Sequence, residues 1–179
     1  MGIWNLLGLD KKKLSDGMKG TAGSSAETET VSKIVHALEG METERARYVA
    51  AFAYLLTRVA RADQHLSEEE SRTIERIVME KGHLSEEQAV LILQMAKTQH
   101  LLFSGTENFL VGREFKNLSS REDHLALLDC LYSVCGTDRN ISVVEDNEIR
   151  KISQELQLSH NDFISVRLRH QEHLSVWKK

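Results

Sequence analysis

The feature that most constrains the fold of this 179-residue chain is that it contains no proline. Average usage of about 5% would give roughly nine prolines in a chain of this length. An interior proline costs a helix about 3 kcal/mol, because it removes a backbone hydrogen bond and clashes with the preceding turn. Aromatic residues are few, and Leu, Ala, Glu, Lys and Arg carry the pattern. The composition therefore predicts an all-α protein, and the length suits one domain with a sizeable core.

Charge and cysteine content exclude several classes of protein. A formal net charge of −4 gives no basic face for binding nucleic acid. Cys130 and Cys135 lie five residues apart on one predicted helix. They are therefore about 140° apart around its axis and cannot form a disulfide with each other. No apolar run approaches the ~20 residues of a membrane span. With no disulfide framework and no signal peptide, we expect a cytoplasmic location.

The first 30 residues are predicted to be a flexible N-terminal segment with a short amphipathic stretch. Residues 15–30 are rich in Gly, Ser, Thr and Ala, which is typical of a flexible linker. The apolar patch before them is followed by three lysines. This order fits an interfacial anchor or partner-docking helix, and also a tail folded loosely on the domain. The candidate membrane or partner contacts are Ile3, Trp4, Leu6, Leu7, Leu9, Lys11, Lys12 and Lys13.

From residue 31 to residue 179 the apolar spacing is that of helices. Segment 44–62 places its large apolar residues on one face and Arg47, Arg58 and Arg61 on the opposite face. A looser stretch at 103–112 is expected to precede a short helix at 113–118. We expect seven or eight helices in a single compact domain. Five of the expected helices begin at or near Ser67, Ser85, Ser120, Ser142 and Ser159.

An internal repeat divides the helical region into two related units. Residues 63–71 open with Asp and run through Ser to Glu, and residues 138–146, 75 positions later, follow the same order. The register holds without a gap on both sides; Leu56, for example, matches Leu131. The repeat predicts two pseudo-symmetric helix–corner–helix units, each with an acidic corner.

The acidic corners are the candidate site for chemistry. In each corner an Asp ends one helix, and a Glu follows in the first turn of the next. Packed about an approximate two-fold axis, the two units would gather Asp63, Glu70, Asp138 and Glu145 on one face. Four oxygen ligands with no nearby Cys suit a hard cation such as Ca²⁺, Mg²⁺ or Mn²⁺. Carboxylates held close together also raise one another's pKa unless a cation neutralises them.

Helix capping explains part of the same pattern. Ser67-x-x-Glu70 and Ser142-x-x-Glu145 are capping boxes, in which the Ser side chain accepts from one backbone N–H and the Glu side chain from another. Residues 85–88 have the same form without a preceding Asp. Capping does not explain why Asp recurs at each helix C-terminus, where the helix dipole disfavours an anion. A metal site and a purely structural corner therefore both stay open.

Longer sequence segments around the corners resemble those of the TerB-like tellurite-resistance family. They are residues 61–70, 127–138, 145–152 and 158–163, and the likeness runs in order from about residue 31 to residue 169. A similar domain forms the N-terminal part of a membrane-anchored DnaJ-type co-chaperone. The resemblance implies an all-helical domain of two related halves. It also implies that the cluster of Asp63, Glu70, Asp138 and Glu145 binds a divalent cation.

The chain departs from the family at one position of each corner. The family usually has Gly after each Asp, whereas this chain has Gln64 and Arg139. If that position needs a positive φ, a residue other than Gly costs about 1 kcal/mol there.

The resemblance implies a stress-response protein of the tellurite-resistance type that acts through protein partners. The resemblance also implies that one such partner is an integral membrane protein of the same resistance system. No enzymatic activity is expected, since the chain carries no nucleophile elbow, phosphate loop or zinc motif. The leading hypothesis is a cytoplasmic protein that binds a divalent cation at its acidic corners. The alternative is a metal-free, co-chaperone-like scaffold held at the inner face of the membrane by its N-terminal contact residues.

Overall fold

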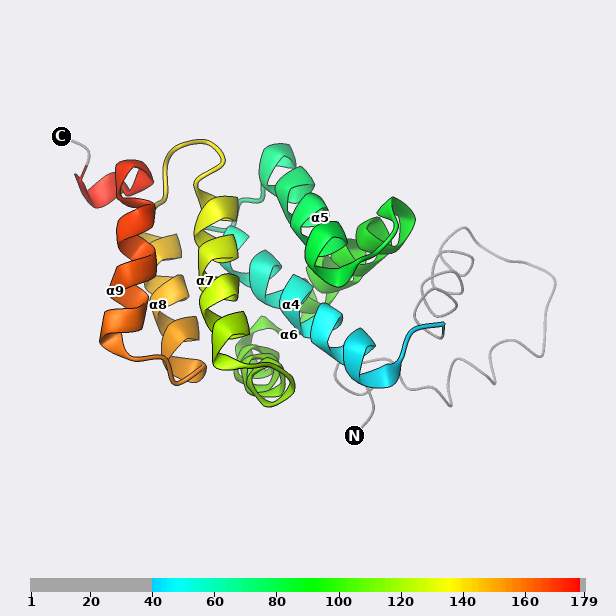
Figure 1. Cartoon of the computed structure of the whole chain (residues 1–179). Coiled ribbons are helices and arrows are strands. Elements are labelled where there is room, and N and C mark those ends of the chain that lie inside the picture. Colours follow the sequence, from blue (N-terminus) through cyan, green and yellow to red (C-terminus); the bar gives the residue numbers. More distant parts are fainter. Residues whose placement is uncertain (1–39, 178–179) are drawn as a thin grey trace.

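The computed structural model describes residues 40–177, and the regular elements in this range are helices (Figure 1). The N-terminal candidate contacts, from Ile3 to Lys13, lie outside the described residues. The prediction of an all-α fold is confirmed. The helices are α4 Thr43–Ala60, α5 Glu68–Gly82, α6 Glu86–Leu118, α7 Arg121–Cys135, α8 Val143–Glu155, α9 His160–Arg169, and the single 3-10 turns η1 Gln171–His173 and η2 Ser175–Trp177.

Serine side chains begin the helices from α5 to α9 where the sequence predicts them. Each is the N-cap of a capping box with the residue three positions later. Such a cap typically contributes about 1 kcal/mol, because it satisfies backbone N–H groups that have no partner within the helix. The five N-caps are Ser67, Ser85, Ser120, Ser142 and Ser159.

Helix α4 forms the centre of the domain. It packs against α6 and contacts α5, α7 and α8, and Figure 1 shows it crossing the molecule between α5 and α7. From Ala46 to Ala60 its residues are buried, apart from half-buried Arg47 and Tyr48. Alanines at Ala50, Ala51 and Ala53 let the neighbouring helices approach its backbone closely. The core is thus built around the helix that leads into the first acidic corner.

The predicted position of Arg58 on the exposed face of α4 is wrong, because its side chain is only 4% exposed. Its Nε donates to Glu148 at 2.7 Å, and its two Nη atoms donate to the Glu155 carboxylate at 2.8 and 2.9 Å. Nη1 also donates to the Asn108 backbone oxygen at 3.3 Å. Arg58 therefore joins α4 to α6 and α8. The two carboxylates compensate for the burial of its charge.

Helix α6 is continuous over 33 residues, so the predicted break at residues 103–112 is wrong. Glycine weakens a helix by about 1 kcal/mol but does not end it when tertiary contacts favour continuation. A Cβ added at Gly112 would lie 2.6 Å from Glu155 Oε2. The glycine at this position therefore gives the Glu155 carboxylate room to reach Arg58.

Replacing Arg58 with Met should lower the free energy of unfolding by about 3 kcal/mol, because Glu148 and Glu155 keep their charges without the buried cation. Urea unfolding measures the loss. The double variant R58M/E155Q should recover part of it. The control R72M removes a fully surface-exposed pair with Glu68 and should cost less than about 0.5 kcal/mol. Equal losses in R58M and R72M would contradict the account.

The two acidic corners

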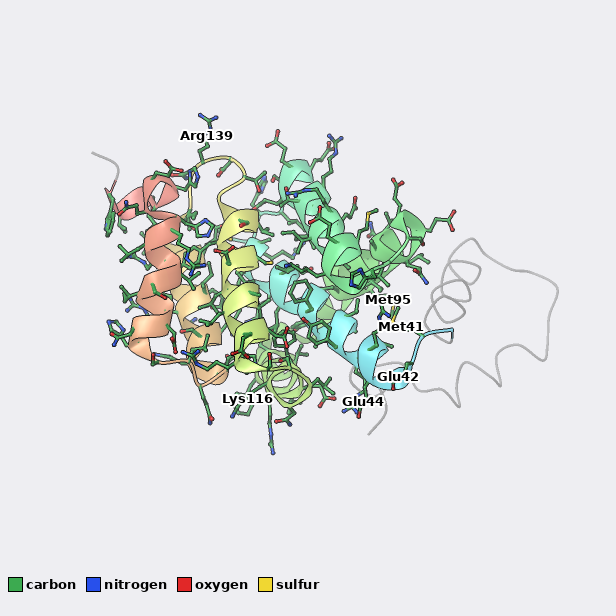
Figure 2. All side chains as sticks on the ribbon, viewed as in Figure 1. Met41, Glu42, Glu44, Met95, Lys116 and Arg139 are labelled. Carbon is green, nitrogen blue, oxygen red and sulfur yellow. The ribbon has the colours of Figure 1, made fainter. Side chains whose placement is uncertain are left out.

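Corner 1, residues 61–67, joins α4 to α5, and corner 2, residues 136–142, joins α7 to α8. Both lie toward the upper part of the molecule in Figure 1. The residue after each Asp has a left-handed backbone, with φ of 68° at Gln64 and 62° at Arg139. The side chain of Arg139 points outward from the tip of corner 2 (Figure 2). Both corners therefore need the positive φ for which the family's usual Gly is suited.

The Asp of each corner closes its own turn. Oδ1 of Asp63 accepts a hydrogen bond from the backbone N–H of His65 at 2.8 Å. Oδ1 of Asp138 accepts one from the N–H of Asn140, also at 2.8 Å. This bond to the N–H two residues ahead is the Asx-turn, which Asp and Asn favour. It gives a structural reason for the recurrence of Asp that capping alone does not supply.

The Glu of each corner completes a capping box. Oε2 of Glu70 accepts from the backbone N–H of Ser67 at 2.8 Å, and Oε2 of Glu145 accepts from that of Ser142 at 2.7 Å. Glu70 is half-buried. Glu145 is only 4% exposed. In both corners one carboxylate oxygen is thus bound to the backbone within a partly desolvated environment.

The two corners interact electrostatically. Burial raises the pKa of Glu70, and the charges of Asp63 and Asp138 raise it further against the opposing hydrogen bonds from Ser67. Burial likewise raises the pKa of Glu145, and the charge of Glu70 adds to it against the bonds from Ser142. A carboxylate of one corner therefore disfavours the ionised form of a carboxylate in the other. The fold thus brings Asp63, Asp138 and Glu145 within electrostatic range of Glu70.

Sequence reasoning missed a fifth member of this region, Cys135 at the end of α7. Its buried thiol hydrogen-bonds to Glu145, and burial together with that carboxylate raises the thiol pKa well above its ordinary value. The sequence does hold a signal, since Cys135 lies three residues before Asp138, about one helical turn. The prediction that no Cys lies near the acidic cluster is thus wrong. Cys130 and Cys135 are both buried free thiols.

A family model described as Tellurite resistance protein TerB matches residues 49–168. The chain belongs to the TerB family. The matched range contains both corners, so the four carboxylates lie within the TerB domain rather than in an addition to it. No curated protein and no solved structure matches the chain.

The TerB domain does not preassemble a metal site in the part of the chain that the structure describes. Among the side chains that the structure describes, in residues 40–42, 44–98 and 108–177, no three His, Cys, Asp or Glu are grouped so that they could hold a metal ion. The donors suit a hard cation chemically, since all four are carboxylates. Their oxygens, however, would have to move closer together to serve as ligands of one cation.

Between residues 40 and 177, no helix is sufficiently long and apolar to span a bilayer.

Replacing Gln64 or Arg139 with Gly should restore the TerB family's usual residue and raise the free energy of unfolding by up to about 1 kcal/mol each, because Gly adopts a positive φ without strain. Urea unfolding of each variant tests this. The control Q94G lies on the exposed face of α6 and should instead lower stability by about 1 kcal/mol. Destabilisation in all three variants would contradict the interpretation of the corners.

Proposed function

We propose that this TerB-family protein is non-enzymatic, binds a divalent cation between its two acidic corners, and acts through protein partners. The observation that carries the proposal is the electrostatic coupling of Glu70 and Glu145. Each is partly desolvated, each has a raised pKa, and each is affected by a carboxylate of the opposite corner. A bound cation would remove this repulsion and favour both ionised forms.

One oxygen of each corner carboxylate already accepts a backbone hydrogen bond, which leaves the other oxygen available to bind a cation. Each Glu uses Oε2 in its capping box, and each Asp uses Oδ1 in its turn. The second oxygens of Glu70, Glu145, Asp63 and Asp138 would serve as ligands. Both Asp side chains are exposed, so their rotation toward the Glu pair would not disturb the core. The four carboxylates would therefore come together as ligands only when the cation binds.

The chemistry of the region favours Ca²⁺, Mg²⁺ or Mn²⁺ over zinc. Hard cations prefer carboxylate oxygens, whereas zinc commonly uses thiolate or imidazole ligands. Cys135, the nearby thiol, is buried and its pKa is raised. It stays protonated at neutral pH and is a poor metal ligand in that form.

Exposed apolar side chains beside corner 2 support binding to a protein partner. Val143 and Val144, in the first turn of α8, are 50% and 52% exposed. Their counterparts in the first unit are Glu68 and Glu69, so the apolar surface is particular to one corner. The proposal extends to a role of the tellurite-resistance type and to an integral membrane protein of the same system as partner. A cytoplasmic location, at the inner face of the membrane, belongs to the same proposal.

Thermal unfolding with and without millimolar Ca²⁺, Mg²⁺ and Mn²⁺ tests the cation site. A cation at 100 times its Kd should stabilise the fold by about 2.7 kcal/mol. In a chain of this size that corresponds to a rise in Tm of roughly 5–10 °C. The absence of a shift with any of the three cations would refute the site.

The matched variants are E70Q/E145Q and E70A/E145A. Glutamine keeps the capping box, as Gln88 does in α6, but removes the charge. E70Q/E145Q should therefore fold stably without cation and lose the cation-dependent rise in Tm. E70A/E145A should lose the rise and also one hydrogen bond of each capping box, at about 1 kcal/mol each. A full cation response in E70Q/E145Q would show that the cation binds elsewhere.

A further inference from the structure

A segment from the C-terminal end closes corner 2. The N–H of Ile141 donates to the His173 oxygen at 2.7 Å, and the N–H of Ser175 donates to the Ile141 oxygen at 2.9 Å. These bonds form an isolated parallel β-bridge between Ile141 and Leu174. Both side chains are fully buried. Corner 2 is therefore completed by a short extended segment that presents one leucine.

Corner 1 has the same left-handed residue and Asx-turn, but no segment among the described residues pairs with it in this way. Leu66 occupies the position equivalent to Ile141, but within residues 40–177 no β-bridge and no backbone hydrogen bond reaches it. Its side chain is only half-buried. The two units differ in where the following helix ends. In the second unit α9 ends at Arg169, and the chain then turns back so that Leu174 reaches corner 2. The equivalent residue, Gln94 (169 − 75), lies inside the continuous helix α6.

The surface around Leu66 is acidic. Residues 61–72 contain four carboxylates against two arginines. Glu68 and Glu69 are exposed in the first turn of α5. The pair between Glu68 and Arg72 spans 3.6 Å at the surface and is worth little. A segment that completes corner 1 should therefore combine a leucine with positive charge.

We propose that residues 11–15 of the same chain dock at corner 1, with Leu14 pairing with Leu66 as Leu174 pairs with Ile141. The order Lys13-Leu14-Ser15 parallels His173-Leu174-Ser175. Lys11, Lys12 and Lys13 precede this leucine and complement the carboxylates of corner 1.

The length of the intervening chain fits this contact. The described residues begin at Gly40, close to the start of α4, and corner 1 follows the end of that helix. The 18 residues of α4 span about 27 Å at 1.5 Å per residue. Leu14 and Gly40 are 26 positions apart. The sequence predicts a flexible segment to residue 30 and helix from residue 31; about 22 Å of root-mean-square extension for the first part and about 15 Å of helix combine to roughly 27 Å. Such a match between linker and span maximises the effective concentration of the docking segment.

Amide hydrogen exchange on the full chain in the presence of a chelator tests the proposal. If the segment is docked about nine-tenths of the time, exchange at the Leu66 N–H should be about tenfold slower than in K11E/K12E/K13E. Ile141 serves as the internal reference, because its N–H is bonded in both proteins. Equal exchange at Leu66 in the two proteins would overturn the proposal.

Neutralising Glu68 and Glu69 tests the charge complementarity, and neutralising Glu86 and Glu87 is the matched control. Glu68 and Glu69 are the first two residues of α5, and Glu86 and Glu87 are the first two of α6; each pair follows a Ser N-cap. E68Q/E69Q should restore fast exchange at Leu66, whereas E86Q/E87Q should leave it slow. Neither pair belongs to the proposed cation site, so this result is independent of cation binding.

A spin label distinguishes docking within one chain from docking between two copies. Cys130 and Cys135 are buried with raised pKa values, so a cysteine at G17C is labelled selectively. Loss of amide signal at residues 64–69 of the labelled chain, but not at residues 139–144, supports the proposal. The same loss in an isotope-labelled chain that carries no spin label, mixed with spin-labelled copies, would overturn it in favour of a second copy.

Discussion

Backbone N–H groups at the two helix–helix corners hold the acidic side chains of this protein, and the other properties of the site depend on that restraint. One oxygen of each carboxylate accepts from the backbone, in an Asx-turn for Asp63 and Asp138 and in a capping box for Glu70 and Glu145. The bonds from Ser67 and Ser142 favour the ionised forms of Glu70 and Glu145. Burial and the neighbouring carboxylates oppose ionisation of the Glu pair, and the balance leaves both with a raised pKa. The corners are thus well hydrogen-bonded turns in which the ionised forms of Glu70 and Glu145 are nevertheless disfavoured.

The local features of the fold were predictable because they depend on neighbours in sequence. A Ser followed three residues later by Glu or Gln satisfies the free N–H groups of a helix start, and the predicted capping boxes at Ser67, Ser85 and Ser142 are confirmed. The helix starts predicted near Ser120 and Ser159 are confirmed as well. The positive φ at Gln64 and Arg139 also follows from sequence once the family's Gly is known. The pattern of two related corners is reproduced in the backbone, whereas an overall two-fold relation of the halves stays a prediction.

The features that sequence reasoning missed depend on residues far apart in the chain. Arg58 reads as exposed because its partners, Glu148 and Glu155, lie on another helix. The continuity of α6 depends on packing that outweighs the low helix propensity of its glycines. The bridge between Ile141 and Leu174 joins a corner to a segment 33 positions away (174 − 141). None of these contacts has a local sequence signal.

The difference between the two corners suggests a division of roles. Corner 2 is completed by the chain itself and presents exposed Val143 and Val144, whereas corner 1 is acidic and its half-buried Leu66 forms no β-bridge with a described residue. A cation between the corners would involve Glu70 and Glu145, and the docking segment would contact Glu68 and Glu69. The two events therefore use different carboxylates and are able to occur together.

The most direct test of the electrostatic coupling is an NMR titration of the side-chain carboxyl groups of Glu70 and Glu145 without cation. Both should titrate above the ordinary value of 4.5. Since the folded-state pKa is raised, these groups stabilise the fold most below pH 4.5, and this contribution is lost as the pH rises through the folded pKa. Adding the cation that raises Tm should lower both pKa values. If both groups titrate at or below 4.5 without cation, the two corners do not raise each other's pKa, and they are structural turns alone.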